Sequence, residues 1–200
     1  MNNRAAIFKE IQSKQSCLCV GLDPDAVRIP AVCGEGVEAM EQFCKGIIDA
    51  THDLAVAFKP NLAFFEQYGA EGWAALERII GYVPDECMVI ADAKRGDIGN
   101  TAKRYAQAMF DGLGAHAITV APYMGADSVE PFMEGYENKW TVLLALTSNS
   151  GASDFEFHGT PPLYEQVLTR AQDWGSADQL MFVVGATRPE FIARARELAP

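Results

Sequence analysis

The sequence lacks the features that mark membrane-spanning, secreted and nucleic-acid-binding proteins. None of its apolar runs approaches the ~20 residues of a membrane-spanning helix, and the N-terminal segment MNNRAAIFKEIQSKQS lacks the apolar centre of a signal peptide. Basic residues are scarce, with 16 Lys and Arg against 27 Asp and Glu and a formal net charge of -11. No basic run offsets this charge, which argues against nucleic acid or a membrane surface as a partner. We therefore expect a soluble, cytoplasmic protein.

Motifs for disulfides, metals and phosphate-binding loops are also missing. The five cysteines form no Cys-x-x-Cys pair, and their odd number favours reduced thiols over a disulfide framework. Cys17 and Cys19 alternate in an apolar segment, so we expect both to be packed in the core. The histidines, His52, His116 and His158, lack H-E-x-x-H spacing, and His116 is expected in the core rather than at a metal site. The sequence contains no G-x-G-x-x-G or P-loop motif that would indicate a nucleotide cofactor.

What is present is the composition of one globular domain, with 49% apolar and 22% charged residues. Six short apolar segments are too continuous for half-exposed strands and short enough for buried parallel ones. They span residues 17–23, 54–61, 87–94, 115–122, 140–149 and 180–187. Helical spacing is clearest over 37–53 and 99–114, where Gly112 and Gly114 are expected to end the helix.

The repeated order of strand, helix and strand predicts right-handed parallel units and an α/β fold. Charged or polar residues stand at the carboxyl ends of successive strands: Asp23, Lys59, Asp92, Lys94 and Ser148. In a TIM barrel such ends converge on one mouth, whereas an open sheet gathers its ligand groups mainly at one switch point. We therefore predict a (β/α)8 TIM barrel with about six βα units present. We interpret residues 1–200 as a single barrel domain that is incomplete at its C-terminus.

The segment DAKRGDIGNT, residues 92–101, places two carboxylates around a lysine at the end of an apolar segment. Residues i and i+2 of a strand face the same way, so Asp92 and Lys94 are expected to point to one side. Lys59 and Asn61 have the same spacing at the end of the preceding strand. A purely structural ion network would cost desolvation for little stability. The pattern therefore favours a reactive site at the ends of adjacent strands.

The chemistry of this set points to decarboxylation without a cofactor. A lysine between two aspartates keeps its proton, which makes it a general acid rather than a Schiff-base nucleophile. An aspartate beside a substrate carboxylate would repel it and favour its departure as carbon dioxide. The lysine would then stabilise and protonate the carbanion left behind.

Asp97 has a structural interpretation as well as a functional one. We expect it to open a helix, where the helix dipole favours a carboxylate, with Thr101 one turn later on the same face. A capping role alone would explain Asp97.

These residues also carry a family resemblance. DAKRGDIGNT resembles the D-x-K-x-x-D-[IV]-x-x-T motif of the orotidine 5'-phosphate decarboxylase family, and with FKPNLAFFEQYG and GLDPD it is similar to the longer bacterial subfamily. The resemblance extends through ITVAPYMGADSVEPF and LTSNSG and covers most of the chain. It implies a cofactor- and metal-independent decarboxylation of orotidine 5'-monophosphate to uridine 5'-monophosphate in de novo pyrimidine biosynthesis.

The resemblance further implies a role for each matched residue. Lys94 would protonate the C6 carbanion, and Asp92 would stand beside the leaving carboxylate. Lys59 would pair with Asp92 and touch the ribose, whose hydroxyls Asp23 and Asn61 would hold.

The remaining matched residues are assigned to the pyrimidine and to a partner subunit. Asp97, Ile98 and Thr101 would reach into the partner's active site across a homodimer, and Ser148 would meet the pyrimidine. Family members continue through two further strands whose loops grip the phosphate, and the sequence contains neither. Arg188 is expected to begin a helix at the surface rather than to replace them.

Two other functions stay open. One is a magnesium-dependent sugar-phosphate decarboxylase or aldolase of the same superfamily. Such an enzyme needs a metal-binding carboxylate at the end of the second strand, where this sequence has Lys59. The other is a non-catalytic, truncated barrel that acts as a binding protein.

Overall fold

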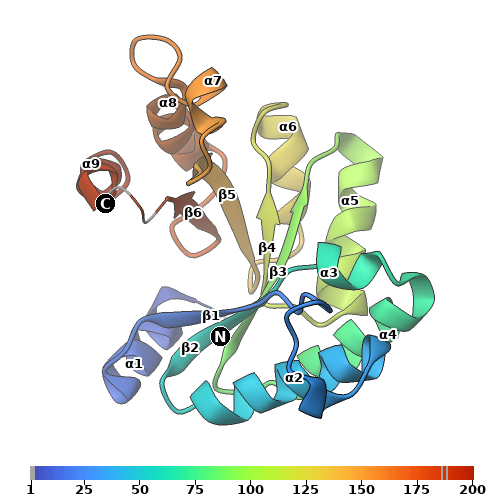
Figure 1. Cartoon of the computed structure of the whole chain (residues 1–200). Helices are drawn as coiled ribbons and strands as arrows, with labels where there is room; N and C mark the ends of the chain where they lie inside the picture. The colour runs from blue at the N-terminus through green and yellow to red at the C-terminus, as the bar shows by residue number, and fades with distance from the viewer. Residues whose placement is uncertain (1–2, 186, 188) are drawn as a thin grey trace. The chain divides into compact units, whose positions relative to one another are not determined.

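The computed structural model describes residues 3–185, 187 and 189–200, which form two compact units (Figure 1). The first unit comprises Met1–Ala93 and Gln107–Ile118, and the second comprises Lys94–Ala106 and Thr119–Pro200. Six strands in the described residues follow one another in the order β1-β2-β3-β4-β5-β6. They are β1 (Leu18–Leu22), β2 (Ala55–Pro60), β3 (Met88–Arg95), β4 (Ala117–Val120), β5 (Trp140–Leu146) and β6 (Leu180–Val184). The six strands expected from the apolar segments are thus confirmed.

The first unit contains β1, β2 and most of β3, and α1 packs against β2. Its helical segments are α1 (Arg4–Lys14), η1 (Ala31–Cys33), α2 (Gly36–Thr51), α3 (Ala63–Glu66), α4 (Gly69–Ile80) and the π-helical η2 (Ala108–Gly112). The apolar face of α2 buries Met40, Cys44 and Ile48 at four-residue steps, and α2 packs against α4. This confirms the helix expected over 37–53.

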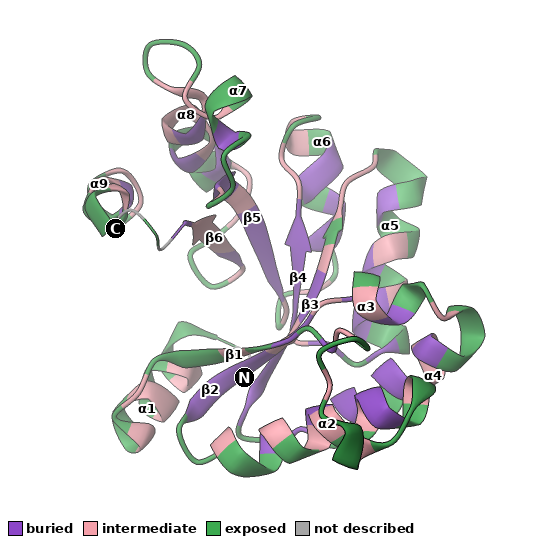
Figure 2. Ribbon diagram, viewed as in Figure 1, coloured by how far each residue is buried: buried purple, intermediate pink, exposed green. Residues whose placement is uncertain are grey.

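Strand β2 is the most deeply buried strand of the first unit, whereas β1 is largely exposed (Figure 2). The two strands pair in parallel, and β1 stands at one end of the strand order. Cys17 and Cys19 are both exposed, and Leu18 between them is 42% exposed. The expectation that these cysteines lie in the core is therefore wrong. Alternating apolar residues identify a strand, but they do not tell whether the strand lies at the edge of a sheet.

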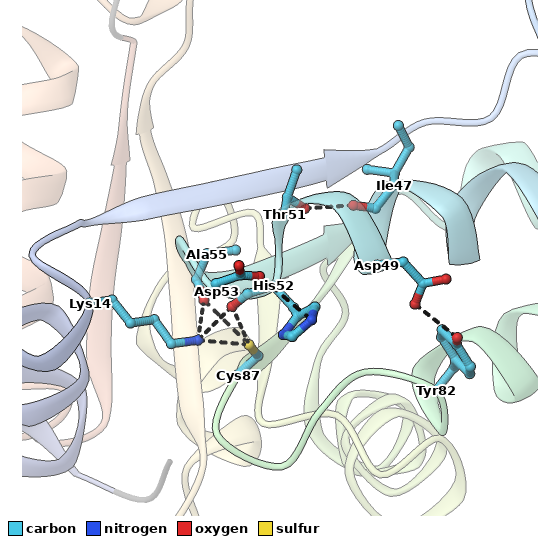
Figure 3. Close-up of polar contacts among 9 residues, drawn as sticks. All are labelled: Lys14, Ile47, Asp49, Thr51, His52, Asp53, Ala55, Tyr82 and Cys87. Carbon is cyan, nitrogen blue, oxygen red and sulfur yellow. Dashed lines mark hydrogen bonds and ion pairs between the residues drawn. The ribbon is translucent and has the colours of Figure 1, made fainter.

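The last residue of α1 ties this helix to β2 through a part-buried group of polar atoms (Figure 3). Lys14 Nζ donates to the carbonyl oxygens of His52 and Ala55, at 2.8 Å each, and to Cys87 Sγ at 3.3 Å. The Cys87 thiol also lies 3.3 Å from the Ala55 carbonyl. Burial raises the pKa of Cys87, and the hydrogen bond from Lys14 opposes this rise. All three ammonium protons of Lys14 therefore have acceptors.

We expect Lys14→Met to lower the free energy of unfolding by about 1–3 kcal/mol, because the variant keeps the apolar stem but leaves two carbonyls without this donor. Urea denaturation of the variant against wild type measures the loss. Lys9→Met is the matched control, since Lys9 is exposed on the same helix. Equal stability of the two variants would show that the Lys14 contacts contribute nothing.

The second unit is built on the ends of β3 and β4 together with β5 and β6, which pair in parallel. Its helical segments are α5 (Gly99–Gln107, whose last residue belongs to the first unit), α6 (Ala126–Val129), η3 (Glu130–Phe132), α7 (Ala152–Phe155), α8 (Leu163–Arg170), η4 (Ala171–Asp173) and α9 (Pro189–Leu198). The helical run that begins at Gly99 ends at Gly112, as expected from the two glycines.

Helices α8 and α9 pack on each other and on the β5–β6 pair. An aromatic trio joins them, in which the Phe157 ring lies 5.7 Å from Tyr164 and 5.3 Å from Phe191, centroid to centroid. At the surface of this contact, Arg194 of α9 holds both carboxylate oxygens of Glu165 on α8, at 3.0 and 2.9 Å. These hydrogen bonds hold the pKa of Glu165 below its usual value. The last helix is thus fixed by apolar packing and by a two-point ion pair.

Candidate functional site

Four of the predicted site residues come together in the first unit, at the carboxyl ends of three neighbouring strands. Lys59 of β2 and Asp92 of β3 form an ion pair, with 2.7 Å between Nζ and Oδ2. Asn61 follows β2, and its Nδ2 donates to Oδ2 of Asp23, which follows β1, at 3.2 Å. The ends of β1, β2 and β3 therefore present Asp, Lys with Asn, and Asp as predicted.

Backbone pairing fixes these four side chains. The β1–β2 register aligns Gly21 with Lys59 and Leu22 with Pro60. One residue further on, the Asn61 N–H donates to the Leu22 carbonyl at 3.1 Å, and Asn61 also forms a parallel bridge to Asp92. The segment FKPN thus continues the sheet for one residue beyond β2. Asn61 therefore lies between Leu22 of β1 and Asp92 of β3.

The Lys59–Asp92 pair combines a buried carboxylate with a partly exposed ammonium. Asp92 is 7% exposed, whereas the Lys59 side chain is 34% exposed. Removing a carboxylate from water is costly unless an opposite charge compensates it, and Lys59 supplies that charge. A buried anion held in this way can act on a substrate with little reorganisation of its surroundings.

The other five predicted residues belong to the second unit: Lys94, Asp97, Ile98, Thr101 and Ser148. Lys94 is exposed near the end of β3 and has a backbone φ of 47°, in the left-handed region. Its N–H donates to the hydroxyl of Thr119 at 2.9 Å. The strand alternation from which we expected Lys94 to point the same way as Asp92 therefore does not apply at Lys94.

This backbone conformation is uncommon for a residue with a side chain and costs about 1–3 kcal/mol. Thr119, which is 1% exposed, stabilises it through the hydroxyl bond, and the Ala121 N–H donates to the Arg95 carbonyl at 2.8 Å just beyond. Strain of this kind concentrates at functional sites. Sequence reasoning missed Thr119, although a lone hydroxyl in the apolar run AHAITV was the available signal.

Asp97 precedes α5 rather than opening it. The helix begins at Gly99, which has a φ of 52°, and Asp97 Oδ1 accepts the N–H of Ile98 at 2.8 Å. The expected helical spacing between Asp97 and Thr101 is therefore wrong, because the left-handed glycine turns the chain between them. Ile98 is 55% exposed, and Thr101 is exposed in the first turn of the helix.

Ser148 follows β5 by two residues and is exposed. The residue before it, Thr147, is held by Glu156, whose carboxylate accepts both the Thr147 N–H and the Thr147 hydroxyl at 2.7 Å. Sequence reasoning also missed Glu156, because nothing in the local pattern links it to a strand nine residues earlier.

Other candidate features lie elsewhere. In the described part of the chain, no three His, Cys, Asp or Glu side chains are arranged to hold a metal ion. His116 is half-buried, and its Nδ1 accepts the Val89 N–H at 3.0 Å, in agreement with a packed position. Arg188 lies outside the described residues. The helices described here are too short or too polar to cross a bilayer.

A cavity of about 650 Å³ in the first unit opens over the start of α2, away from these residues. It is lined by Val32, Cys33, Gly34, Glu35, Glu38, Glu41 and Gln42. None of these lining residues is basic, so the cavity does not compete with the strand ends as the site for a phosphorylated ligand.

Comparison with known proteins gives one consistent result. Residues 16–199 match the model of the orotidine 5'-phosphate decarboxylase / HUMPS family. The chain is 51% identical over 199 residues to an orotidine 5'-phosphate decarboxylase of Flavobacterium johnsoniae, covering 97% of the chain and 72% of that relative. It is 46% identical over 205 residues to the Bacteroides fragilis enzyme of the same name, covering 99% of the chain and 74% of the relative.

The structural comparison agrees. A solved structure of Leishmania donovani OMP decarboxylase matches with a TM-score of 0.90 and 45% identity, covering 100% of the chain and 77% of that structure. The predicted fold class is therefore confirmed: the chain has the fold of a TIM barrel, of which six strands are present in the described residues.

Proposed function

The chain belongs to the orotidine 5'-phosphate decarboxylase / HUMPS family, and from this premise we propose that it decarboxylates orotidine 5'-monophosphate to uridine 5'-monophosphate in pyrimidine biosynthesis. The observation that carries the proposal is the 2.7 Å ion pair between Lys59 and the buried Asp92. Lys94 follows Asp92 by two residues on the same strand. This order of charges suits decarboxylation without a metal.

Each charge has a task in the proposed reaction. The anion of Asp92 stands beside the substrate carboxylate and destabilises it in the ground state. The bond between C6 and the carboxylate breaks, carbon dioxide leaves, and the electron pair stays on C6. Lys94 donates its ammonium proton to C6 and regains one from solvent. Lys59 pairs with Asp92 and contacts the ribose.

Neutral groups and carboxylates orient the nucleotide. Asp23 and Asn61, which already contact each other at 3.2 Å, bind the ribose hydroxyls. The Ser148 hydroxyl donates a hydrogen bond to the pyrimidine or accepts one from it. No catalytic step in this scheme uses a metal or an organic cofactor.

The enzyme acts in the cytoplasm as a homodimer with shared active sites. Asp97, Ile98 and Thr101 reach the partner's substrate, and the exposure of Ile98 in the single chain supports this role. An apolar side chain that is 55% exposed gains stabilisation when a partner covers it.

Mixing two inactive variants tests the shared site. Lys94→Ala and Asp97→Ala homodimers should each be inactive. After unfolding and refolding together, half of the dimers carry one variant of each kind and one intact site, so about a quarter of wild-type activity should return. Separate refolding of each variant is the control. If activity stays absent after mixing while size-exclusion chromatography shows dimers, Lys94 and Asp97 belong to the same subunit's site.

The function itself is tested by following the loss of pyrimidine absorbance with orotidine 5'-monophosphate in the presence of EDTA. Decarboxylation that EDTA does not affect supports the proposal. Activity only on a sugar phosphate with added magnesium would instead support the metal-dependent relatives. The comparisons do not favour that alternative or a non-catalytic binding protein, and Lys59 occupies the position where a metal-binding carboxylate would stand.

A further inference from the structure

Glu156 holds the end of β5 with both of its carboxylate oxygens. Oε2 accepts the Thr147 N–H, and Oε1 accepts the Thr147 hydroxyl, each at 2.7 Å. The backbone of Glu156 is itself fixed, because its N–H donates to the Ala152 carbonyl and its carbonyl accepts the Tyr164 N–H, both at 2.9 Å. The half-buried carboxylate thus links α7 and the start of α8 to the residue directly before Ser148.

A third group completes this arrangement. The Thr147 hydroxyl also lies 2.6 Å from Oδ1 of Asn149. A hydroxyl has one proton, which the charged carboxylate of Glu156 attracts more strongly than a neutral amide oxygen does. The side chains of Thr147 and Asn149, on the two sides of Ser148, therefore meet at the hydroxyl that Glu156 contacts.

The opposite side of Ser148 is closed by the end of β6. A Cβ atom at Gly185 would lie 3.1 Å from the Ser148 nitrogen and 3.2 Å from the Ser148 Cα. The Gly185 N–H donates to the Leu146 carbonyl at 2.8 Å, which holds the two chain segments together. The crowding atoms are backbone, so they cannot swing aside as the tip of a side chain can.

We propose that Glu156 and Gly185 are positioning residues that set the place of the Ser148 hydroxyl, and so determine how well the pyrimidine ring of the substrate is recognised. The inference rests on the proposed function, in which Ser148 meets the pyrimidine. An error of ~1 Å in such a contact can cost as much as 100-fold in rate, so a rigid two-sided hold has a direct catalytic consequence. The proposal assigns no chemical step to either residue.

The chemistry of the hold predicts which substitutions at Glu156 are tolerated. Glutamine keeps the length and supplies Oε1 for the Thr147 N–H, while its NH₂ group donates to the Thr147 hydroxyl, which then turns toward Asn149 Oδ1. Aspartate keeps the charge but is one methylene too short, and alanine removes both contacts. We therefore expect Glu156→Gln to keep most of kcat/KM, and Glu156→Asp and Glu156→Ala to lose about 10- to 100-fold.

A double-mutant cycle with Ser148→Ala separates positioning from general stability. If Glu156 acts through Ser148, adding Glu156→Ala to Ser148→Ala should lower kcat/KM little further. Gly185→Ala, which perturbs the same backbone from the other side, should behave in the same way. Asp154→Asn, which changes an exposed carboxylate on α7, is the matched control and should stay within twofold of wild type.

Ligand binding gives a second measurement that a loss of stability would not mimic. The inhibition constant of uridine 5'-monophosphate should rise in Glu156→Asp, whereas that of ribose 5-phosphate, which lacks the pyrimidine, should stay unchanged. The inference is overturned if Glu156→Ala and Glu156→Asp keep wild-type kcat/KM. It is also overturned if the double variants lose kcat/KM by the full product of the two single-variant losses. An inactive wild-type protein would instead overturn the proposed function, and the inference with it.

Discussion

Lys94→Ala should lower kcat for decarboxylation by at least about 10³-fold, because the proposed reaction loses both its proton donor and the positive charge that stabilises the carbanion. A positioned general acid contributes about 10²–10⁴-fold, and a preorganised charge at the developing anion adds to it. The loss should appear at saturating substrate, measured by pyrimidine absorbance. Lys103→Ala is the matched control, since Lys103 lies on α5 and pairs at the surface with Glu134.

The backbone at Lys94 supplies a second part of this prediction. With a φ of 47°, Lys94 pays a conformational cost that glycine does not pay. Lys94→Gly should therefore be inactive and yet more resistant to thermal unfolding than Lys94→Ala. A Lys94→Ala protein within tenfold of wild-type kcat would remove Lys94 from the chemistry. Equal thermal stability of the two variants would show that the left-handed backbone is not strained.

Asp92→Asn is expected to lower kcat by about 10²–10³-fold without raising KM for orotidine 5'-monophosphate. The asparagine keeps the shape of the buried side chain but no longer repels the substrate carboxylate, and Lys59 loses the charge that lies 2.7 Å from its Nζ. Removal of ground-state repulsion should let the substrate bind as well as before or better. The measurement is a full Michaelis–Menten comparison of the variant with wild type.

The control for this variant is Asp85→Asn, an exposed carboxylate shortly before the same strand, which should leave both constants unchanged. A fall in kcat/KM caused only by a higher KM would contradict the account. It would mean that Asp92 binds the substrate equally in the ground state and the transition state.

Much of the fold and half of the site were predictable from the sequence for physical reasons. The continuous apolar segments have the length of buried parallel strands and are too continuous for half-exposed ones. Parallel strands bring their carboxyl ends to one edge of the sheet. The Lys59–Asp92 and Asn61–Asp23 contacts follow from that rule, because each residue stands at a strand end. For these contacts, the position of a residue at a strand end can be read from the sequence and also decides which residues lie near it in the fold.

The features that were not predictable depend on neighbours that a local pattern does not contain. The exposure of Cys17 and Cys19 follows from the edge position of β1, which strand order decides. The left-handed backbone of Lys94 depends on the Thr119 hydroxyl, which lies 25 residues further along the chain. The hydrogen bond from the Thr147 N–H to the Glu156 carboxylate likewise joins a strand end to the segment after α7. In each case, the feature depends on how segments that are distant in sequence are arranged in space.

The proposed function has the charges around Lys94 perform decarboxylation without a metal or a cofactor. It can be tested by the reaction of the protein with carboxyl-labelled orotidine 5'-monophosphate in D₂O with EDTA. We expect one labelled carbon dioxide for each uridine 5'-monophosphate formed, with one deuterium at C6, and no release from Lys94→Ala. A folded, dimeric wild-type protein that releases no labelled carbon dioxide under these conditions would contradict it.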